Sequence, residues 1–152
     1  EQTFYYSNMA PMHKGEGFNS GVWGSLEDKV RSWSSSKVGT DTLYVVTGCV
    51  TEGSETTVKD NNGKAVTVPA GFYKALLRYS KTDGYCGAAF YLDHKVYTSM
   101  VLPKESILSI DALEEKLGID FFPNLEALIG KEAAEKVEAT SPISVDNKFW
   151  GF

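Results

Sequence analysis

The chain has 152 residues, of which 42% are hydrophobic and 23% charged, and its formal net charge is −5. These proportions are typical of a globular domain and exclude a disordered chain or a long coiled coil. The pI of about 5.0 provides no overall positive field for nucleic acid. No apolar run approaches the roughly 18 residues of a membrane span, so we expect one domain over residues 1–152 and no membrane contact.

The first third of the chain predicts a strand, a loop, a helix and a second strand. Residues 3–7 are rich in β-formers, and a polar loop containing Pro11 follows them. Between Asn19 and about Trp33, apolar residues recur at the spacing of a helical face that seeks the core. These residues are Val22, Leu26, Val30 and Trp33. The segment LYVVTGCVT, residues 43–51, is continuously apolar and β-branched, which predicts a central strand buried on both faces.

Two hairpins are predicted in the middle of the chain. The segment TTVKDNNGKAVTV places Asn62 and Gly63 between alternating runs, which is the composition of a type I′ turn. The segment LLRYSKTDGYCGAAFYL repeats this pattern at Asp83 and Gly84. Residues 72–79 and 85–92 are therefore expected to pair as antiparallel strands.

The final third of the chain is helical in character. Residues 110–117 form an amphipathic segment that Gly118 stops, and Pro123 suits the first turn of another helix. Residues 131–138 are helical in composition. Together these elements predict an α+β fold in which a mainly antiparallel sheet is flanked by helices.

A stripe of residues four apart, Asn19, Trp23, Glu27 and Arg31, runs along the first predicted helix. Spacing alone favours an exposed face on which Glu27 and Arg31 form an ion pair worth a few tenths of a kcal/mol. The alternative is a site for a hydrated magnesium ion beside a phosphate, because an amide oxygen, a carboxylate and a guanidinium suit both groups. Asn8, between a predicted strand and a proline, is a further candidate.

The sequence around this helix resembles a known family. SNMAP at residues 7–11 and FNSGVWGSLEDKVR at residues 18–31 resemble the second half of the catalytic motif of the DNA/RNA non-specific endonucleases. These are the ββα-metal nucleases related to the Serratia enzyme. Further similar segments follow in the family's order, namely LYVVTGCV, VPAGFYKALLRY, GAAFYL and GIDFFPNLE. The resemblance implies a ββα-metal nuclease-like fold that is incomplete at its amino-terminal side.

The resemblance also implies a role for each candidate residue. Asn19 matches the family's only direct protein ligand to Mg²⁺, which Mn²⁺ can replace, and Glu27 matches the carboxylate that holds water of the ion's hydration shell. Arg31 matches the arginine that steadies negative charge at the phosphorus, and Asn8 matches an asparagine that orders the site near the scissile phosphate. The implied reaction is hydrolysis of phosphodiester bonds in DNA and RNA backbones by a base-activated water.

One part of the family pattern is absent from this chain. The family's general base is a histidine in a DRGH-like motif that precedes the SNM segment, and this chain has only His13 and His94. We interpret His13 as an exposed loop residue and His94 as a turn residue. Loss of a general base costs about 10²- to 10⁴-fold in rate, so we expect this chain alone to be nearly inert.

Two explanations fit the missing histidine. In the first, which we favour, the chain is the carboxy-terminal part of a longer nuclease, and an amino-terminal segment supplies the base as its partner. In the second, the chain is a catalytically inactive relative or a fragment that binds nucleic acid or protein. The resemblance predicts a secreted or periplasmic location. Whether Cys49 and Cys86 form a disulfide depends on strand order and stays open at this point.

Overall fold

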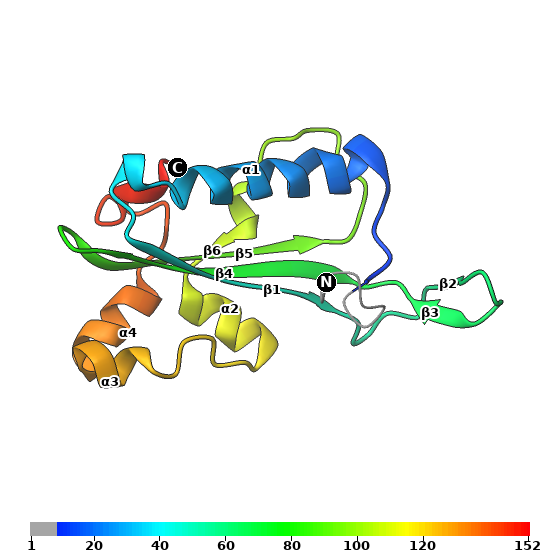
Figure 1. The fold of residues 1–152 in the computed structure, drawn as a ribbon. Coiled ribbons are helices and arrows are strands. Elements are labelled where there is room, and N and C mark those ends of the chain that lie inside the picture. The colour runs from blue at the N-terminus through cyan, green and yellow to red at the C-terminus, as the bar shows by residue number, and fades with distance from the viewer. Residues whose placement is uncertain (1–8) are drawn as a thin grey trace.

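The computed structural model describes residues 9–152, so the strand expected at residues 3–7 and the candidate Asn8 lie outside the described part. Its main sheet has four strands in the order β1-β4-β5-β6, and every neighbouring pair is antiparallel. The strands are β1 Thr42–Val50, β4 Gly71–Ser80, β5 Gly84–Asp93 and β6 Ile107–Leu108. A separate hairpin, β2 Thr57–Lys59 with β3 Ala65–Thr67, projects from one end (Figure 1).

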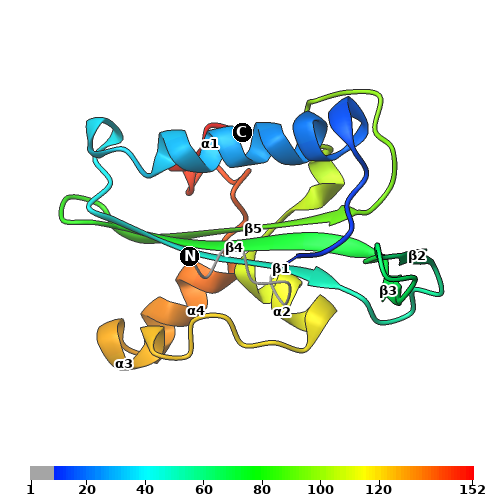
Figure 2. The same cartoon turned by 45° about the vertical axis from the view of Figure 1, so that its right-hand side comes forward.

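Helices cover both faces of the main sheet. Helix α1 lies on one face, and α2, α3 and α4 lie on the other (Figures 1 and 2). The helices are α1 Gly24–Trp33, α2 Ile110–Leu117, α3 Leu125–Ile129 and α4 Lys131–Ala139. A π-helical turn, Asn19–Trp23, leads directly into α1, and short 3₁₀ turns occur at Gly15–Gly17, Ser36–Val38, Lys104–Ser106 and Lys148–Trp150. The α+β prediction is confirmed, as are the helices expected at residues 110–117 and 131–138.

The order of the strands corrects one prediction. The apolar segment expected to be a central strand is β1, which among residues 9–152 lies at an edge of the sheet, and all of its side chains are exposed or half-buried. The strand buried on both faces is β4, between β1 and β5. Composition predicts that a segment is a strand, but its neighbours are decided by long-range pairing. The prediction that β1 is buried, which came from composition alone, was therefore wrong.

Strand order also settles the disulfide question. Cys49 lies in β1 and Cys86 in β5, and β4 separates them. Two strands that are not adjacent lie about 10 Å apart, whereas a disulfide needs Cα atoms within about 7 Å. Both thiols are free. Within residues 9–152, no helix has the length and apolar character needed to cross a bilayer.

Each face of the sheet has its own apolar core. Between the sheet and α1, the core contains the buried side chains of Phe18, Val22, Leu26, Trp33, Phe72, Leu76, Phe90 and Trp150. Between the sheet and the other helices, it contains Ala75, Leu77, Ala89, Ile110, Leu113, Phe121, Leu125 and Ala134. The predicted apolar face of the first helix is therefore confirmed, with Val30 partly buried against the same core.

The hairpin turns differ from the type I′ prediction. Gly63 and Gly84 have positive φ, of 79° and 77°, but in residues 9–152 no residue other than glycine has positive φ. Type I′ geometry would require positive φ at Asn62 as well. Instead, the Asp60 carboxylate accepts hydrogen bonds from the backbone N–H groups of Asn62 and Lys64, at 2.9 and 2.8 Å. The side chain of Asp60 thus selects a different turn around the left-handed glycine.

Glu138 in α4 has an unusual pKa. Burial, followed by repulsion from neighbouring carboxylates, raises its pKa from 4.5 to about 7. The neighbouring carboxylates are those of Glu114, Asp111, Asp120 and Glu126. The pKa of Glu138 is higher in the folded chain than in the unfolded chain. Protonation of Glu138 therefore favours the folded chain over the unfolded chain. This contribution to stability is fully present below pH 4.5 and is lost as the pH rises through 7.

We expect the substitution Glu138→Gln to stabilise the chain at pH 8 and to leave its stability unchanged at pH 4. Because Glu138 is only half-buried and solvent screens the repulsion, the expected gain is about 1 kcal/mol in the free energy of unfolding. Chemical denaturation at the two pH values measures it. Glu132→Gln, at an exposed position of the same helix, is the control. An equal gain at both pH values would contradict the account.

Candidate functional site

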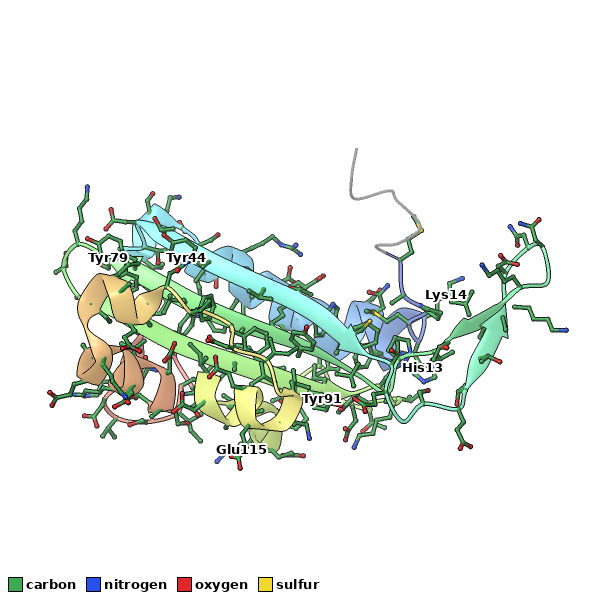
Figure 3. The ribbon with its side chains drawn as sticks, turned by 90° about the horizontal axis from the view of Figure 1, so that it is seen from below. His13, Lys14, Tyr44, Tyr79, Tyr91 and Glu115 are labelled. Atoms are coloured by element: carbon green, nitrogen blue, oxygen red, sulfur yellow. The ribbon has the colours of Figure 1, made fainter. Side chains whose placement is uncertain are left out.

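The candidate site lies where the chain enters the π-helical turn that precedes α1. Asn19 is the first residue of that turn, and its side chain is exposed. The loop before it carries His13 and Lys14, which lie near the base of the β2–β3 hairpin (Figure 3). Tyr44 and Tyr79 mark the opposite end of the sheet in the same view. The site is thus at the hairpin end of the molecule.

Local packing explains why Asn19 is presented outward. Its neighbour Phe18 is fully buried and packs against the rings of Trp23 and Phe72, with centroid distances of 6.1 and 5.4 Å. The backbone departs from helical geometry at Gly21, with φ −96° and ψ −117°. The buried Phe18 directly before Asn19 and the kink two residues after it leave the Asn19 side chain exposed at the start of the turn.

The helix also approaches Asn19 closely. A Cβ atom at position 24 would lie 3.0 Å from the Asn19 carbonyl oxygen, so glycine is the residue that fits Gly24 without displacement. The backbone N–H of Asn19 donates to the carbonyl oxygen of His13 at 3.2 Å. Within residues 9–152, the Asn19 side chain makes no hydrogen bond. Its amide oxygen is therefore available to a ligand as far as these residues are concerned.

Glu27 lies two turns further along and is paired with a buried lysine. Its carboxylate is 3.9 Å from the Nζ of Lys74, whose side chain is 7% exposed while that of Glu27 is 41% exposed. Lys74 also donates to the hydroxyl of Thr47 at 2.9 Å and sits 4.5 Å from the ring centroid of Trp23. Burial lowers the pKa of Lys74, and the Glu27 carboxylate opposes this shift. The buried cation beneath α1 thus faces the Glu27 carboxylate.

Lys74 is a site neighbour that our sequence analysis missed. It is the register partner of Thr47 on β1 and projects from β4 toward α1. The signal was present, because Lys74 and Arg78 interrupt the otherwise apolar segment of residues 71–80 at positions that share a face. Arg78 has a structural environment, since it donates to Thr40 and Gly39 and pairs with Asp83 at 3.1 Å. Only Lys74 reaches a candidate site residue.

Arg31 does not form the ion pair that spacing favours. Its guanidinium contacts Asp28 at 2.7 Å, three residues earlier, and both side chains are more than 70% exposed, at 71% and 74%. The expected pair with Glu27 is therefore absent among the described contacts, because Glu27 turns toward Lys74 instead. A surface pair of this kind contributes at most about 1 kcal/mol, so Arg31 can exchange Asp28 for a phosphate at little cost.

The donor set suits a hydrated hard cation. In residues 9–152 no group of three or more His, Cys, Asp or Glu side chains could hold a metal ion. Magnesium needs few protein ligands, because it keeps most of its waters. Because Glu27 is paired with Lys74, we expect its carboxylate to meet such an ion through water and not directly. The residues present fit Mg²⁺ on these terms.

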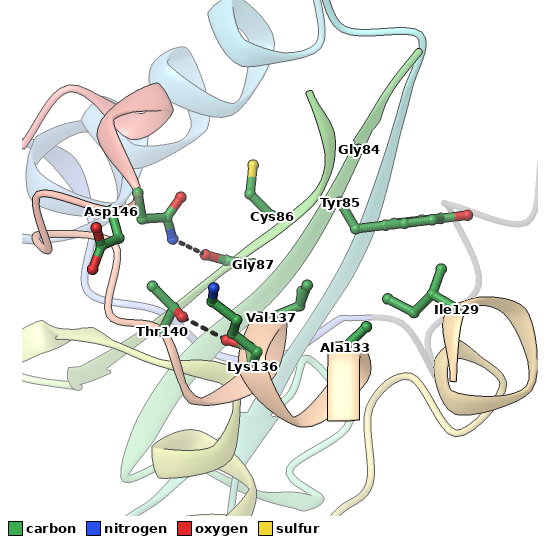
Figure 4. Close-up of a pocket in the computed structure, with 11 residues that line it drawn as sticks. Gly84, Tyr85, Cys86, Gly87, Ile129, Ala133, Lys136, Val137, Thr140 and Asp146 are labelled. Carbon is green, nitrogen blue, oxygen red and sulfur yellow. Dashed lines mark hydrogen bonds between the residues drawn. The ribbon is translucent and has the colours of Figure 1, made fainter. Parts of the chain in front are cut away.

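A pocket elsewhere in the molecule is separate from this site. It has a volume of about 520 Å³, and its lining includes Gly87, Lys136 and Asn147 (Figure 4). The buried amide of Asn147 donates to the Gly87 carbonyl at 2.9 Å and ties the carboxy-terminal segment to β5. Gly87 is at the end of β5 that lies farther from the candidate site, and Asn19, Glu27 and Arg31 do not line the pocket.

Comparison with known proteins identifies the family. Residues 1–128 match the sequence profile of the DNA/RNA non-specific endonucleases. The chain belongs to this family. The chain is also similar to the mitochondrial endonuclease G of Caenorhabditis elegans, with 28% identity over 148 residues, which cover 90% of this chain and 46% of the relative.

A solved structure agrees with this assignment. The crystal structure of the EndoG/EndoGI complex, described as showing the mechanism of EndoG inhibition, contains a chain with 26% identity and a TM-score of 0.61. The match covers 82% of this chain and 52% of that one. The antiparallel sheet with its helices is thus the fold of a non-specific endonuclease. The chain spans about half the length of the relatives it matches.

Proposed function

We propose that these residues are the carboxy-terminal part of a magnesium-dependent, sugar-nonspecific endonuclease that hydrolyses phosphodiester bonds in DNA and RNA. The observation that carries the proposal is the presentation of Asn19, whose exposed amide stands at the start of the turn that leads into α1. Family membership supports the reaction class. The chain covers about half of each relative, and in this proposal a preceding segment supplies the general-base histidine.

Each residue has a distinct task in the proposed reaction. The Asn19 amide oxygen holds the hydrated Mg²⁺ ion, which when bound supplies charge stabilisation at the phosphate. The Glu27 carboxylate, positioned by Lys74, accepts hydrogen bonds from water around the ion. Arg31 leaves Asp28 and binds the phosphate oxygens as negative charge develops on them. Asn8 orders the site, and the histidine of the preceding segment activates the attacking water.

Backbone contacts define the substrate class in this proposal. Contacts to phosphate carry no sequence information, so cleavage is expected to be independent of sequence and of the sugar. The net charge of −5 gives no long-range attraction for nucleic acid. Binding therefore depends on the ion and the local cations at the site. An exported, secreted or periplasmic protein remains our proposal for its location.

A second candidate function is a binding module without catalysis. The observation that favours it is the lack of a DRGH-like motif in this chain. Degradation of plasmid DNA and of RNA by the intact longer protein, with and without EDTA, distinguishes the two. We expect both substrates to be degraded with Mg²⁺ present and neither with EDTA. Binding without cleavage in the presence of Mg²⁺ would contradict the nuclease proposal.

A further inference from the structure

His94 occupies a more constrained position than that of an ordinary turn residue. It follows β5 directly, and both nitrogens of its imidazole are engaged. Nε2 lies 2.8 Å from the backbone nitrogen of His13, and Nδ1 lies 2.9 Å from the carbonyl oxygen of Pro69. The ring therefore joins the loop before Asn19 to the segment that leads into β4.

These two contacts define the protonation of the ring. The His13 backbone N–H can only donate, so Nε2 must be the unprotonated acceptor. The proton of the neutral ring is then on Nδ1, which donates to Pro69. Burial lowers the pKa of His94, repulsion from His13 adds to this effect and the hydrogen bond to Pro69 opposes it. Lowering of the pKa keeps the ring in the neutral form that both contacts require.

Aromatic packing holds the ring in place. The centroids of Phe18 and Phe72 each lie 5.0 Å from that of His94, with their planes inclined at 71° and 82°. The His13 ring lies 4.4 Å away on the exposed side. The backbone of the turn adds two further ties, because His94 N–H donates to Ala70 at 2.8 Å and Tyr97 N–H donates to Gly17 at 2.7 Å.

The contacts continue from His94 to the candidate ligand. The backbone N–H of His13 donates to the imidazole of His94, and the carbonyl oxygen of His13 accepts a hydrogen bond from the N–H of Asn19. Pro69, His94, His13 and Asn19 thus form one hydrogen-bonded series that begins two residues before β4. Residues 13–18 are thus tied to the sheet by this series, together with the Tyr97–Gly17 hydrogen bond and the buried Phe18 ring.

We propose that His94 is a positioning residue of the candidate site, whose imidazole holds the loop of residues 13–18 and thereby the Asn19 amide in the orientation that binds the metal ion. This rests on the proposed function only in its last step, the binding of the ion. The first step, restraint of the loop, stands on the described contacts alone. His94 touches neither the substrate nor the ion in this scheme.

The test compares three variants of the 152-residue chain. His94→Phe keeps the aromatic packing but removes both nitrogens, and His94→Gln retains one donor and one acceptor. His13→Ala is the matched control, because it removes the neighbouring ring but keeps both backbone contacts. Two readouts are measured by NMR and titration, namely the exchange rates of the His13 and Asn19 amide hydrogens and the dissociation constant for Mn²⁺ used alone.

With His94→Phe we expect amide exchange at His13 and Asn19 to be at least tenfold faster and Mn²⁺ binding to be about tenfold weaker. His94→Gln should recover part of both losses, and His13→Ala should change neither by more than about twofold. If His94→Phe fails to fold, His94→Leu, which adds less volume than phenylalanine, provides the same comparison. Unchanged exchange in a folded His94→Phe or His94→Leu variant would overturn the proposal.

The two readouts separate this proposal from the proposed function. If the unsubstituted chain binds no Mn²⁺, the metal site fails, and the exchange rates still decide whether His94 restrains the loop. If Mn²⁺ binds equally to the unsubstituted chain and His94→Phe while exchange accelerates, His94 is a stability residue and the positioning role is wrong.

Discussion

Replacing Asn19 with alanine in the intact nuclease should reduce plasmid cleavage by about 10³-fold. The substitution removes the one amide oxygen that we assign to Mg²⁺, and a metal ion contributes several kcal/mol of charge stabilisation in the transition state. The fold should survive, because the Asn19 side chain is exposed and makes no hydrogen bond within residues 9–152. Initial rates of supercoiled plasmid nicking, measured with circular dichroism on the same samples, check both statements.

Asn61→Ala is the matched control for this experiment. Asn61 is an exposed asparagine in the turn of the β2–β3 hairpin and is not one of the candidate site residues. Its replacement should leave the cleavage rate within about twofold. An Asn19→Ala protein that nicks plasmid at the normal rate would show that the metal ligand lies elsewhere, and the site assignment would then be wrong.

Replacing Lys74 with methionine should raise the Mg²⁺ concentration needed for half-maximal cleavage by about 10- to 100-fold. Groups that orient the partners of a metal site typically have effects of this size. Methionine keeps the apolar stem beside Trp23 but removes the ammonium group that faces Glu27 at 3.9 Å. Without that cation, the Glu27 carboxylate is free to move away from the ion's hydration shell.

A charge-matched substitution isolates this effect. Lys37→Met removes the same charge from an exposed position in the turn after α1 and should leave the Mg²⁺ dependence unchanged. Lys74→Arg keeps a cation at the same place and should lie between the methionine variant and the unsubstituted protein. Equal Mg²⁺ requirements for Lys74→Met and Lys37→Met would mean that Lys74 only stabilises the fold.

Local signals in the sequence predicted most elements of the fold. The apolar spacing from Val22 to Trp33 found the helix above the sheet, and Gly118 correctly ended α2, where it adopts φ 66°. Features that depend on contacts distant in the sequence were not predictable in this way. The edge position of β1 follows from the pairing order, and the hairpin turn follows from an Asp60 side chain that bonds backbone atoms ahead of it.

In the candidate site, too, local sequence signals were predictable and contacts between distant segments were not. Asn19, Glu27 and Arg31 were identified because they lie in one continuous motif. The partners that position them come from distant segments, since Lys74 is on β4 and His94 follows β5. The predicted pair between Glu27 and Arg31 was wrong for this reason, because a lysine 47 residues away in the chain competes for the carboxylate. The assigned roles of Asn8, Asn19, Glu27 and Arg31 remain predictions.

Crystals of the 152-residue chain soaked in manganese chloride test the central claim most directly. We expect one anomalous difference peak about 2.1 Å from the Asn19 amide oxygen, ringed mainly by water, with Glu27 reaching it through a water molecule. The peak should disappear in crystals of Asn19→Ala. A manganese ion bound elsewhere with none at Asn19, or a peak that persists in the variant, would contradict the account.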